Sequence, residues 1–129
     1  MQTSELLARL EAATGADREL NKLLAPLVGL RLVEEGHPLG SCCYDKNGHG
    51  VPLPSFTASI DAALTLVPEG WFFDIRIRPQ SLIDQHAPFL KMGEVSFTHP
   101  DGEAGIWRRV QAATPALAIC IAALRARHD

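Results

Sequence analysis

Residues 36–50, with the sequence GHPLGSCCYDKNGHG, bring together the side chain types that most often hold a zinc ion. The candidate ligands in this stretch are His37, Cys42, Cys43 and His49. Structural zinc sites usually space their cysteines as C-x2-4-C, so that one turn of the chain supplies two ligands. Here the two cysteines are adjacent, and their side chains diverge in an extended chain. The spacing therefore favours a turn-rich loop with half-buried thiols over the alternative of a zinc site.

The same cysteines suggest a second chemistry, nucleophilic catalysis by a thiol. A reactive cysteine needs a cation, a helix N-terminus or a close base that lowers its pKa. The chain has five histidines, but no flanking motif supports pairing one of them with Cys42 or Cys43. The chain has three cysteines, an odd number, and adjacent cysteines form a disulfide only with strained geometry. We therefore expect reduced thiols, no cofactor and no enzymatic activity.

A third set of residues could form a binding face on a sheet. The set consists of Arg76, Arg78, Trp107 and Arg109. Arginines interleaved with an aromatic side chain can hold nucleic acid or an acidic protein surface. The simpler interpretation is a solvated strand face on which Asp74 and Glu94 pair with the arginines, since sheets with one exposed face normally have this composition.

The elements that position these residues begin with two short helices. Leucines recur at helical spacing in residues 4–13, where Thr3 or Ser4 can cap the helix, and again in residues 20–28. Thr14 and Asp17 stand at capping-box spacing before the second helix. Pro26 lacks the N–H that an interior turn needs and should kink or shorten that helix. The pattern predicts a helical hairpin over about residues 4–29.

Residues 34–55 contain four glycines and three prolines, which predicts a long turn-rich loop with at most a short strand. A third helix is expected after an N-cap at Thr57, ending at Pro68. Residues 71–78 then alternate apolar and polar side chains, so that residues 71, 73, 75 and 77 should face the core of a strand. A helical turn is expected at residues 81–85.

Two further strands are expected at residues 94–98 and 105–110, with Val95 and Phe97 facing inward. Thr114 and Pro115 then suit the N-cap and first position of a closing helix, ALAICIAAL, which is apolar on nearly every side. Such a helix is normally packed by more than one neighbour. We therefore predict a central core helix, with a dimer interface on its small-residue face (Ala118, Ala122, Ala123) as the alternative.

The order of elements predicts an α+β fold: about four helices beside a small, mostly antiparallel sheet of three or four strands. The length of 129 residues fits a single domain over 1–129, with the hairpin at about 4–29, the loop at 34–55 and a helix-sheet-helix body at 56–127. Apolar residues make up 47% of the chain, enough for one core.

The net charge of −3 gives no electrostatic footprint for nucleic acid and is too small for a mimic of DNA. No apolar run approaches the roughly 20 residues that span a bilayer, and the first residues do not resemble a signal peptide. We therefore expect a cytoplasmic protein that does not bind membranes and for which nucleic acid is an unlikely partner.

Two segments, FTASIDAALTLVPEGW (56–71) and ATPALAICIAALRA (113–126), resemble the signature segments of the phage ABA sandwich domain family. The segment LLARLEAATGADREL (6–20) is similar to the opening of many of its members. The resemblance implies a layered α–β–α sandwich and an origin in a phage or prophage, inside a bacterial host cell. The family has no assigned activity, so the resemblance implies no catalytic residues in this chain. The alternating strand at 71–78 departs from this pattern, because helices on both faces would bury both sides of the strand. Either the second helical layer covers only part of the sheet, or the polar residues of this strand lie near an edge.

Together these observations lead to one functional hypothesis and two alternatives. We expect a non-enzymatic accessory protein of a phage or prophage that binds a protein of the phage or the host, as a monomer or homodimer. The first alternative is a nucleic-acid-binding module that uses Arg76, Arg78 and Arg109. The second is a zinc or thiol site in the 36–50 loop.

Overall fold

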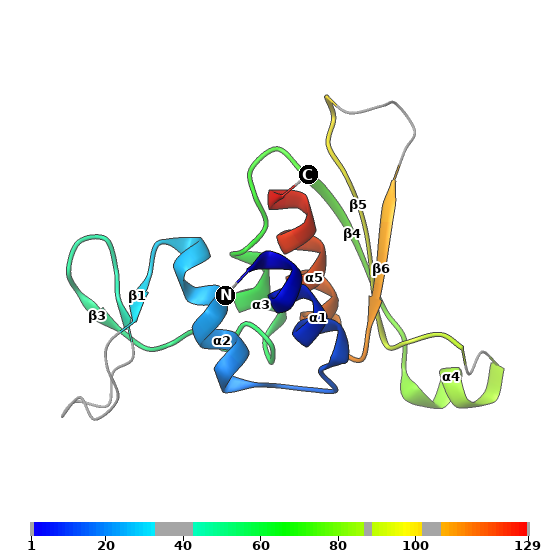
Figure 1. The fold of residues 1–129 in the computed structure, drawn as a ribbon. Helices are drawn as coiled ribbons and strands as arrows, with labels where there is room; N and C mark the ends of the chain where they lie inside the picture. Colours follow the sequence, from blue (N-terminus) through cyan, green and yellow to red (C-terminus); the bar gives the residue numbers. More distant parts are fainter. Residues whose placement is uncertain (1, 33–42, 87–88, 102–106, 129) are drawn as a thin grey trace.

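The computed structural model describes residues 2–32, 43–86, 89–101 and 107–128. Within these ranges it contains five α-helices and two three-stranded antiparallel sheets, so the predicted α+β class is confirmed (Figure 1). The first half contains α1 (Thr3–Ala12), α2 (Arg18–Leu24), the 3-10 helix η1 (Ala25–Val28), β1 (Arg31–Leu32), β2 (Cys43–Tyr44), β3 (Gly50–Val51) and α3 (Ile60–Leu64). The second half contains β4 (Phe72–Ile77), α4 (Gln80–His86), β5 (Gly93–Thr98), β6 (Arg108–Ala112) and α5 (Pro115–Arg127).

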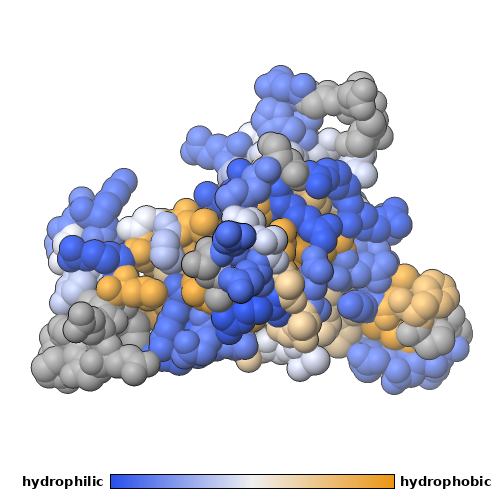
Figure 2. Space-filling view, viewed as in Figure 1, coloured by the Kyte–Doolittle hydropathy of each residue, from blue (hydrophilic) through white to orange (hydrophobic). Residues whose placement is uncertain are grey.

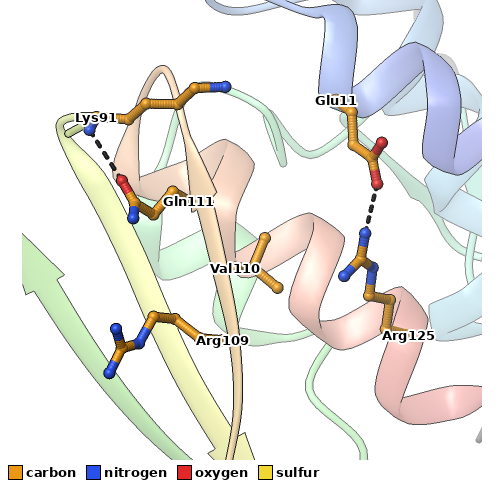
Figure 3. Close-up of a pocket in the computed structure, with 6 residues that line it drawn as sticks. All are labelled: Glu11, Lys91, Arg109, Val110, Gln111 and Arg125. Carbon is orange, nitrogen blue, oxygen red and sulfur yellow. Dashed lines mark hydrogen bonds and ion pairs between the residues drawn. The ribbon is translucent and has the colours of Figure 1, made fainter. Parts of the chain in front are cut away.

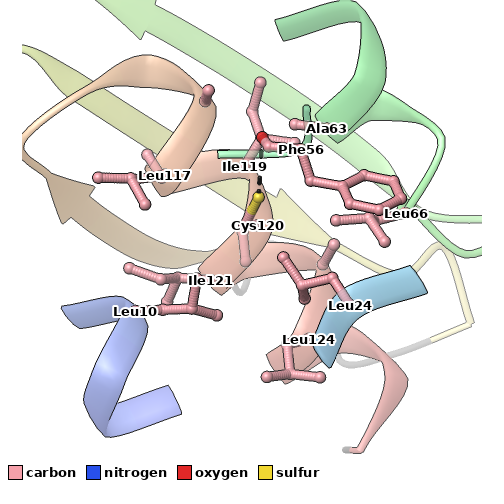
Figure 4. Close-up of a cluster of buried hydrophobic side chains, with 14 of the residues drawn as sticks. Leu10, Leu24, Phe56, Ala63, Leu66, Leu117, Ile119, Cys120, Ile121 and Leu124 are labelled. Atoms are coloured by element: carbon pink, nitrogen blue, oxygen red, sulfur yellow. Dashed lines mark hydrogen bonds between the residues drawn. The ribbon is translucent and has the colours of Figure 1, made fainter. Parts of the chain in front are cut away.

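Helix α5 is the centre of the molecule, as its apolar composition predicts. The Oγ1 of Thr114 accepts a hydrogen bond from the N–H of Leu117 at 3.2 Å, and Pro115 occupies the first turn. The helix packs against the β4–β5–β6 sheet on one side and against α1 and α3 on the other (Figures 1 and 4). Its alanine face is buried within the chain, so the alternative of a dimer interface on that face is wrong.

The main sheet is a meander in which β5 lies between β4 and β6. Phe73 is paired with Phe97, and Ile75 with Val95, in the register of β4 and β5. These odd-numbered positions pack against the core, as predicted from the alternation of the sequence. Ile77, the last position predicted to face the core, is instead 58% exposed, because it lies at the end of an edge strand. The third strand, β6, begins at Arg108, and its inward side chains are Val110 and Ala112; residues 105 and 106 of the predicted strand lie outside the residues that the structure describes.

The N-terminal hairpin forms as predicted, but its caps differ. The N-cap of α1 is Gln2, without a side-chain hydrogen bond, in place of Thr3 or Ser4. The cap of α2 is Asp17 itself, whose Oδ1 accepts hydrogen bonds from the N–H groups of the next turn. As expected, Pro26 shortens α2, and the chain continues from Leu24 into the 3-10 helix η1. This helix is capped at its C-terminus by Gly29, which has a positive φ of 79°.

A buried polar contact ties α2 to the segment before α3. The predicted N-cap Thr57 is instead buried, and Ser59 caps α3. The Oγ1 of Thr57 accepts a hydrogen bond from the N–H of Asp17 at 2.8 Å and lies 2.8 Å from the Oδ1 of Asn21, which also accepts from the Thr57 N–H. A side chain enclosed by partners in this way fixes the position of the chain at this point. Helix α3 is also shorter than predicted and ends at Leu64, before Pro68.

The turn-rich region contributes more regular structure than the sequence indicated. Strands β1, β2 and β3 form a separate small sheet and add nothing to the main one. The β2–β3 hairpin turns at residues 45–49, where the Oδ1 of Asp45 accepts hydrogen bonds from the N–H groups of Asn47 and His49, both at 2.9 Å. The His49 N–H donates a hydrogen bond to the Asp45 carboxylate, and this bond is the main reason that the pKa of Asp45 lies below its ordinary value.

Helix α4, expected only as a turn at residues 81–85, lies on the side of the main sheet that faces away from α5 (Figure 1). It stands at one end of the sheet and leaves the rest of this outer face without a helix among the residues that the structure describes. The arrangement is compatible with a layered sandwich whose second helical layer covers only part of the sheet.

Candidate functional site

The outer face of the main sheet carries three cross-strand rows that follow directly from the register. Strand β4 supplies Phe72, Asp74 and Arg76, which face Thr98, Ser96 and Glu94 of β5. Ser96 and Glu94 in turn face Arg109 and Gln111 of β6. The face therefore begins with an aromatic row, and charged and polar rows follow toward α4.

Arg78 does not contribute to an open binding face. Its Nη2 atom lies 3.1 Å from the Oε1 of Glu94, and its Nη1 donates to the carbonyl oxygen of Lys91 at 3.2 Å. The exposed fractions of the two paired side chains are only 19% for Arg78 and 3% for Glu94. The carboxylate thus neutralises this arginine, which agrees with the interpretation that Glu94 pairs with an arginine of the sheet.

The side chains of Arg76 and Arg109 are exposed, and neither side chain forms a hydrogen bond or ion pair with another residue that the structure describes. They lie on opposite edges of the sheet, because β4 and β6 flank β5. Trp107, half exposed at 50%, precedes β6 by one residue and lies two residues from Arg109. The four predicted face residues therefore separate into Trp107 with Arg109 at β6, Arg76 at β4, and the paired Arg78.

A shallow pocket of about 280 Å³ lies along the β6 edge (Figure 3). Its lining residues come from four parts of the chain: Glu11, Lys91, Arg109, Val110, Gln111 and Arg125. The backbone N–H of Lys91 donates to the Oε1 of Gln111 at 3.0 Å, and the Nη2 of Arg125 lies 2.6 Å from the Oε1 of Glu11. Three of the lining residues are cationic and one is a carboxylate, which is already paired with Arg125. The side chains of Arg109 and Gln111 point to the outer face of the sheet, away from Glu11 and Arg125 (Figure 3). The pocket has a positive charge in a chain whose net charge is −3.

Sequence reasoning missed Lys91 and Arg125 as members of this pocket. In the sequence, Arg125 is a cation near the C-terminus of a helix, a position that is usually explained by its favourable interaction with the helix dipole. Lys91 precedes a strand without any motif. The pairing of β5 with β6 brings Lys91 beside Gln111, and the packing of α5 against β6 brings Arg125 to the same edge of the sheet.

The residues of the 36–50 loop fall in two groups. His37 and Cys42 lie outside the residues that the structure describes. Cys43 is fully buried in β2 as part of the core, not half-buried as expected, whereas His49 is exposed at the hairpin turn. In the described ranges, no group of three or more His, Cys, Asp or Glu side chains is placed to hold a metal ion. The zinc site with all four ligands stays an untested hypothesis.

Exposed apolar side chains gather around α4 (Figure 2). Leu82 on α4 is 53% exposed, and Phe89 just after it is 80% exposed. In the described part of the chain, no helix is long and apolar enough to cross a membrane.

Cys120 is the other cysteine that the structure describes, and it has a structural setting. It is buried in α5, and its Sγ donates to the carbonyl oxygen of Phe56 at 3.3 Å. Burial raises the pKa of this thiol to about 12. The thiol is therefore protonated at neutral pH and is unsuited to nucleophilic attack.

Comparisons with known proteins give no relative for this chain. No family model matches it, and neither the curated proteins nor the solved structures contain a match.

Proposed function

We propose that this protein is a non-enzymatic accessory protein of a phage or prophage that acts by binding an acidic segment of another protein. The binding site is the β6 surface, which we define as Lys91, Trp107, Arg109, Gln111 and Arg125. The observation that carries the proposal is the cationic pocket along the β6 edge, beside a half-exposed tryptophan. Tryptophan and arginine are the side chains that most often contribute large binding energies in protein interfaces.

Charge favours a protein partner over nucleic acid. Binding to a nucleic acid backbone depends on several cations that each neutralise a phosphate. Arg78 is paired with Glu94, and Arg76 lies at the far edge of the sheet, so the β6 surface lacks two of the three arginines that the nucleic-acid alternative requires. A short acidic segment needs only the local charge of Lys91 and Arg109, because Arg125 is already paired with Glu11.

The phage or prophage origin rests on the resemblance of three segments of the sequence. These segments form α1, α3 and α5 in this fold, and they supply residues of the hydrophobic core. The genes beside the coding sequence test this part of the proposal. Neighbouring phage structural genes would support a role in assembly, and neighbouring early genes would support interference with the host. A chromosomal setting without phage genes would contradict the proposed origin.

Binding is tested by following the backbone amide and indole N–H signals in NMR spectra during titration with an extended peptide of alternating Glu and Val. We expect shifts at Trp107, Arg109 and Gln111. The variant Arg109→Glu should raise the dissociation constant at least about tenfold, since it reverses an exposed charge of the β6 surface.

Lys46→Glu is the matched control, because Lys46 is exposed at the β2–β3 turn, away from the β6 surface. If both variants lost affinity equally, the loss would come from the change in net charge alone, and this would contradict the proposal. Tighter binding of a single-stranded oligonucleotide than of the peptide, again lost in Arg109→Glu, would favour the nucleic-acid alternative.

A further inference from the structure

Strand β4 has a free edge. It pairs with β5 on one side, and on its other side no strand that the structure describes lies beside it. The N–H of Arg78 donates to the carbonyl oxygen of Met92 at 2.7 Å, which continues the β4–β5 ladder by one residue. Hydrogen-bonded pairs alternate along an antiparallel ladder. The even-numbered residues of β4 therefore bond β5, and the N–H and C=O groups of Phe73, Ile75 and Ile77 point toward the free edge.

The core thins at this edge. Val95 in the central strand is fully buried, and Val110 on β6 is 6% exposed, whereas Phe73 and Ile75 are only half-buried and Ile77 is 58% exposed. A six-residue edge that presents apolar side chains and unpaired backbone groups is a template for another strand. Natural edges of this kind are either protected or used.

The sequence of this edge is complementary to itself. If two copies of β4 pair antiparallel with Ile75 opposite Ile75, then Asp74 of each copy lies opposite Arg76 of the other on the outer face. On the inner face, Phe73 lies opposite Ile77. The pair of Asp74 and Arg76 falls in a non-hydrogen-bonded position of this ladder, where side chains approach most closely.

Charge selects this register. A shift of the pairing by two residues in one direction places Asp74 opposite Asp74, and a shift in the other direction places Arg76 opposite Arg76. Like charges directly opposite each other destabilise a sheet. Asp74 and Arg76 are both exposed, and neither forms an ion pair with another described residue, so both are available for the pairing.

We propose that β4 is a self-association edge: a second copy of the chain pairs with it antiparallel about Ile75, giving a twofold-symmetric dimer with one continuous six-stranded sheet. The ladder contains six backbone hydrogen bonds, two at each of the three pairs formed by Phe73, Ile75 and Ile77. The β6 surface lies at the opposite edge of the sheet, so the dimer displays two copies of it at its two ends. The proposal does not depend on what binds the β6 surface.

The test is a charge-reversal cycle followed by sedimentation velocity. We expect a concentration-dependent dimer for the parent. Asp74→Arg places two arginines opposite each other, and Arg76→Asp places two aspartates opposite each other, so each variant alone should weaken dimerisation at least about tenfold. An equimolar mixture of the two variants should form a heterodimer, and the double variant that exchanges both charges should dimerise again.

The matched control is Arg109→Asp, which changes charge equally at the other edge and should leave the dimer intact. A second measurement uses the parent alone: hydrogen exchange at the amides of Phe73, Ile75 and Ile77 should slow as protein concentration rises. A parent that stays monomeric at about 1 mM, where binding energies near −4 kcal/mol become visible, would overturn the proposal. Single variants that still dimerise, or a mixture that stays monomeric, would overturn it as well.

Discussion

At the scale of single residues, environment decides what a side chain can do. Arg78 and Arg109 belong to the same sheet and carry the same charge, yet Arg78 is enclosed by Glu94 and Arg109 opens onto a pocket. A buried charge that has found its partner is costly to release. Of these two, only Arg109 is therefore available for binding, although the sequence gives both residues equal weight.

The 36–50 loop leads to a prediction about metal. We expect the purified protein to carry less than stoichiometric zinc, and a chelator to leave its melting temperature unchanged, since a structural zinc would contribute directly to folding. Elemental analysis and thermal melts with EDTA check this. One equivalent of tightly held metal, lost together with structure, would promote the zinc hypothesis to first place. Because Cys43 is buried, Cys43→Ser should cost about 1–3 kcal/mol by burying a hydroxyl, and this loss alone is no sign of metal.

The buried thiol of Cys120 predicts a loss of stability at high pH. Its pKa is about 12 in the folded protein, against an ordinary value of 9.0 for an exposed thiol. Because the folded state holds the proton more tightly, its advantage is complete below pH 9 and is lost as pH rises toward 12, by up to about 1.4 kcal/mol per pH unit. Urea unfolding at pH 8 and pH 10 should therefore show a smaller decrease for Cys120→Ala than for the parent. Equal decreases would contradict the assignment.

At the scale of elements, the contact between β5 and α5 depends on a glycine. A Cβ atom built on Gly93 would lie 2.6 Å from the Cα of Pro115, closer than real Cβ contacts, and the obstacle is backbone at the start of α5. Gly93→Ala should therefore force the strand and helix apart and lower the free energy of unfolding by about 2 kcal/mol or more.

Gly15→Ala is the control for this prediction, because nothing lies within 4 Å of a Cβ at that position. It should be neutral or slightly stabilising, since alanine reduces the entropy of the unfolded chain. Chemical denaturation of both variants makes the comparison. Equal stability of the two would mean that the approach of α5 to β5 is looser than the structure shows.

The contact between α2 and the segment before α3 leads to a second prediction at this scale. Thr57→Val keeps the shape of the side chain but leaves the N–H of Asp17 without its acceptor. The expected cost is about 2 kcal/mol, the usual cost of an unsatisfied buried polar group. Thr65→Val, at an exposed threonine, should stay within about 0.5 kcal/mol of the parent. Similar melting temperatures for the two variants would show that Thr57 does not fix this segment.

At the scale of the whole molecule, α5 holds the other elements together. Leu10 of α1, Leu24 of α2 and Ala63 of α3 join the same cluster of buried side chains around it (Figure 4). Loss of this helix would expose the inner face of the sheet and the apolar faces of the helical layer together. The unfolding of the domain should therefore be cooperative.

Ile121→Asp tests this role. The side chain is fully buried, and a carboxylate there has no partner, so we expect a cost of about 4 kcal/mol or more. Such a cost removes most of the stability of an ordinary domain. Circular dichroism melts should show a largely unfolded variant, whereas Leu82→Asp, at an exposed position on α4, should melt close to the parent. A stably folded Ile121→Asp protein would contradict the central position of α5 in the core.

Local chemistry in the sequence is sufficient to predict much of the fold. The alternation at 71–78, the pair Thr114–Pro115 and the all-apolar helix that follows depend on neighbours within a few residues, so the strand, the cap and the core helix are predictable. Patterns without a clear period are less informative. The two-residue strands of the small sheet are too short to show alternation.

The candidate site depends on contacts that no local pattern contains. Lys91, Arg109 and Arg125 are far apart in the chain and come to one edge of the sheet only because β5 pairs with β6 and α5 packs against β6. Which arginine is neutralised follows from the position of Glu94 in the central strand, and the free edge of β4 follows from the order of the strands. The sequence by itself determined the type and spacing of these side chains. The tertiary structure decided which of them are neighbours, since pairing and burial are properties of distant segments brought together.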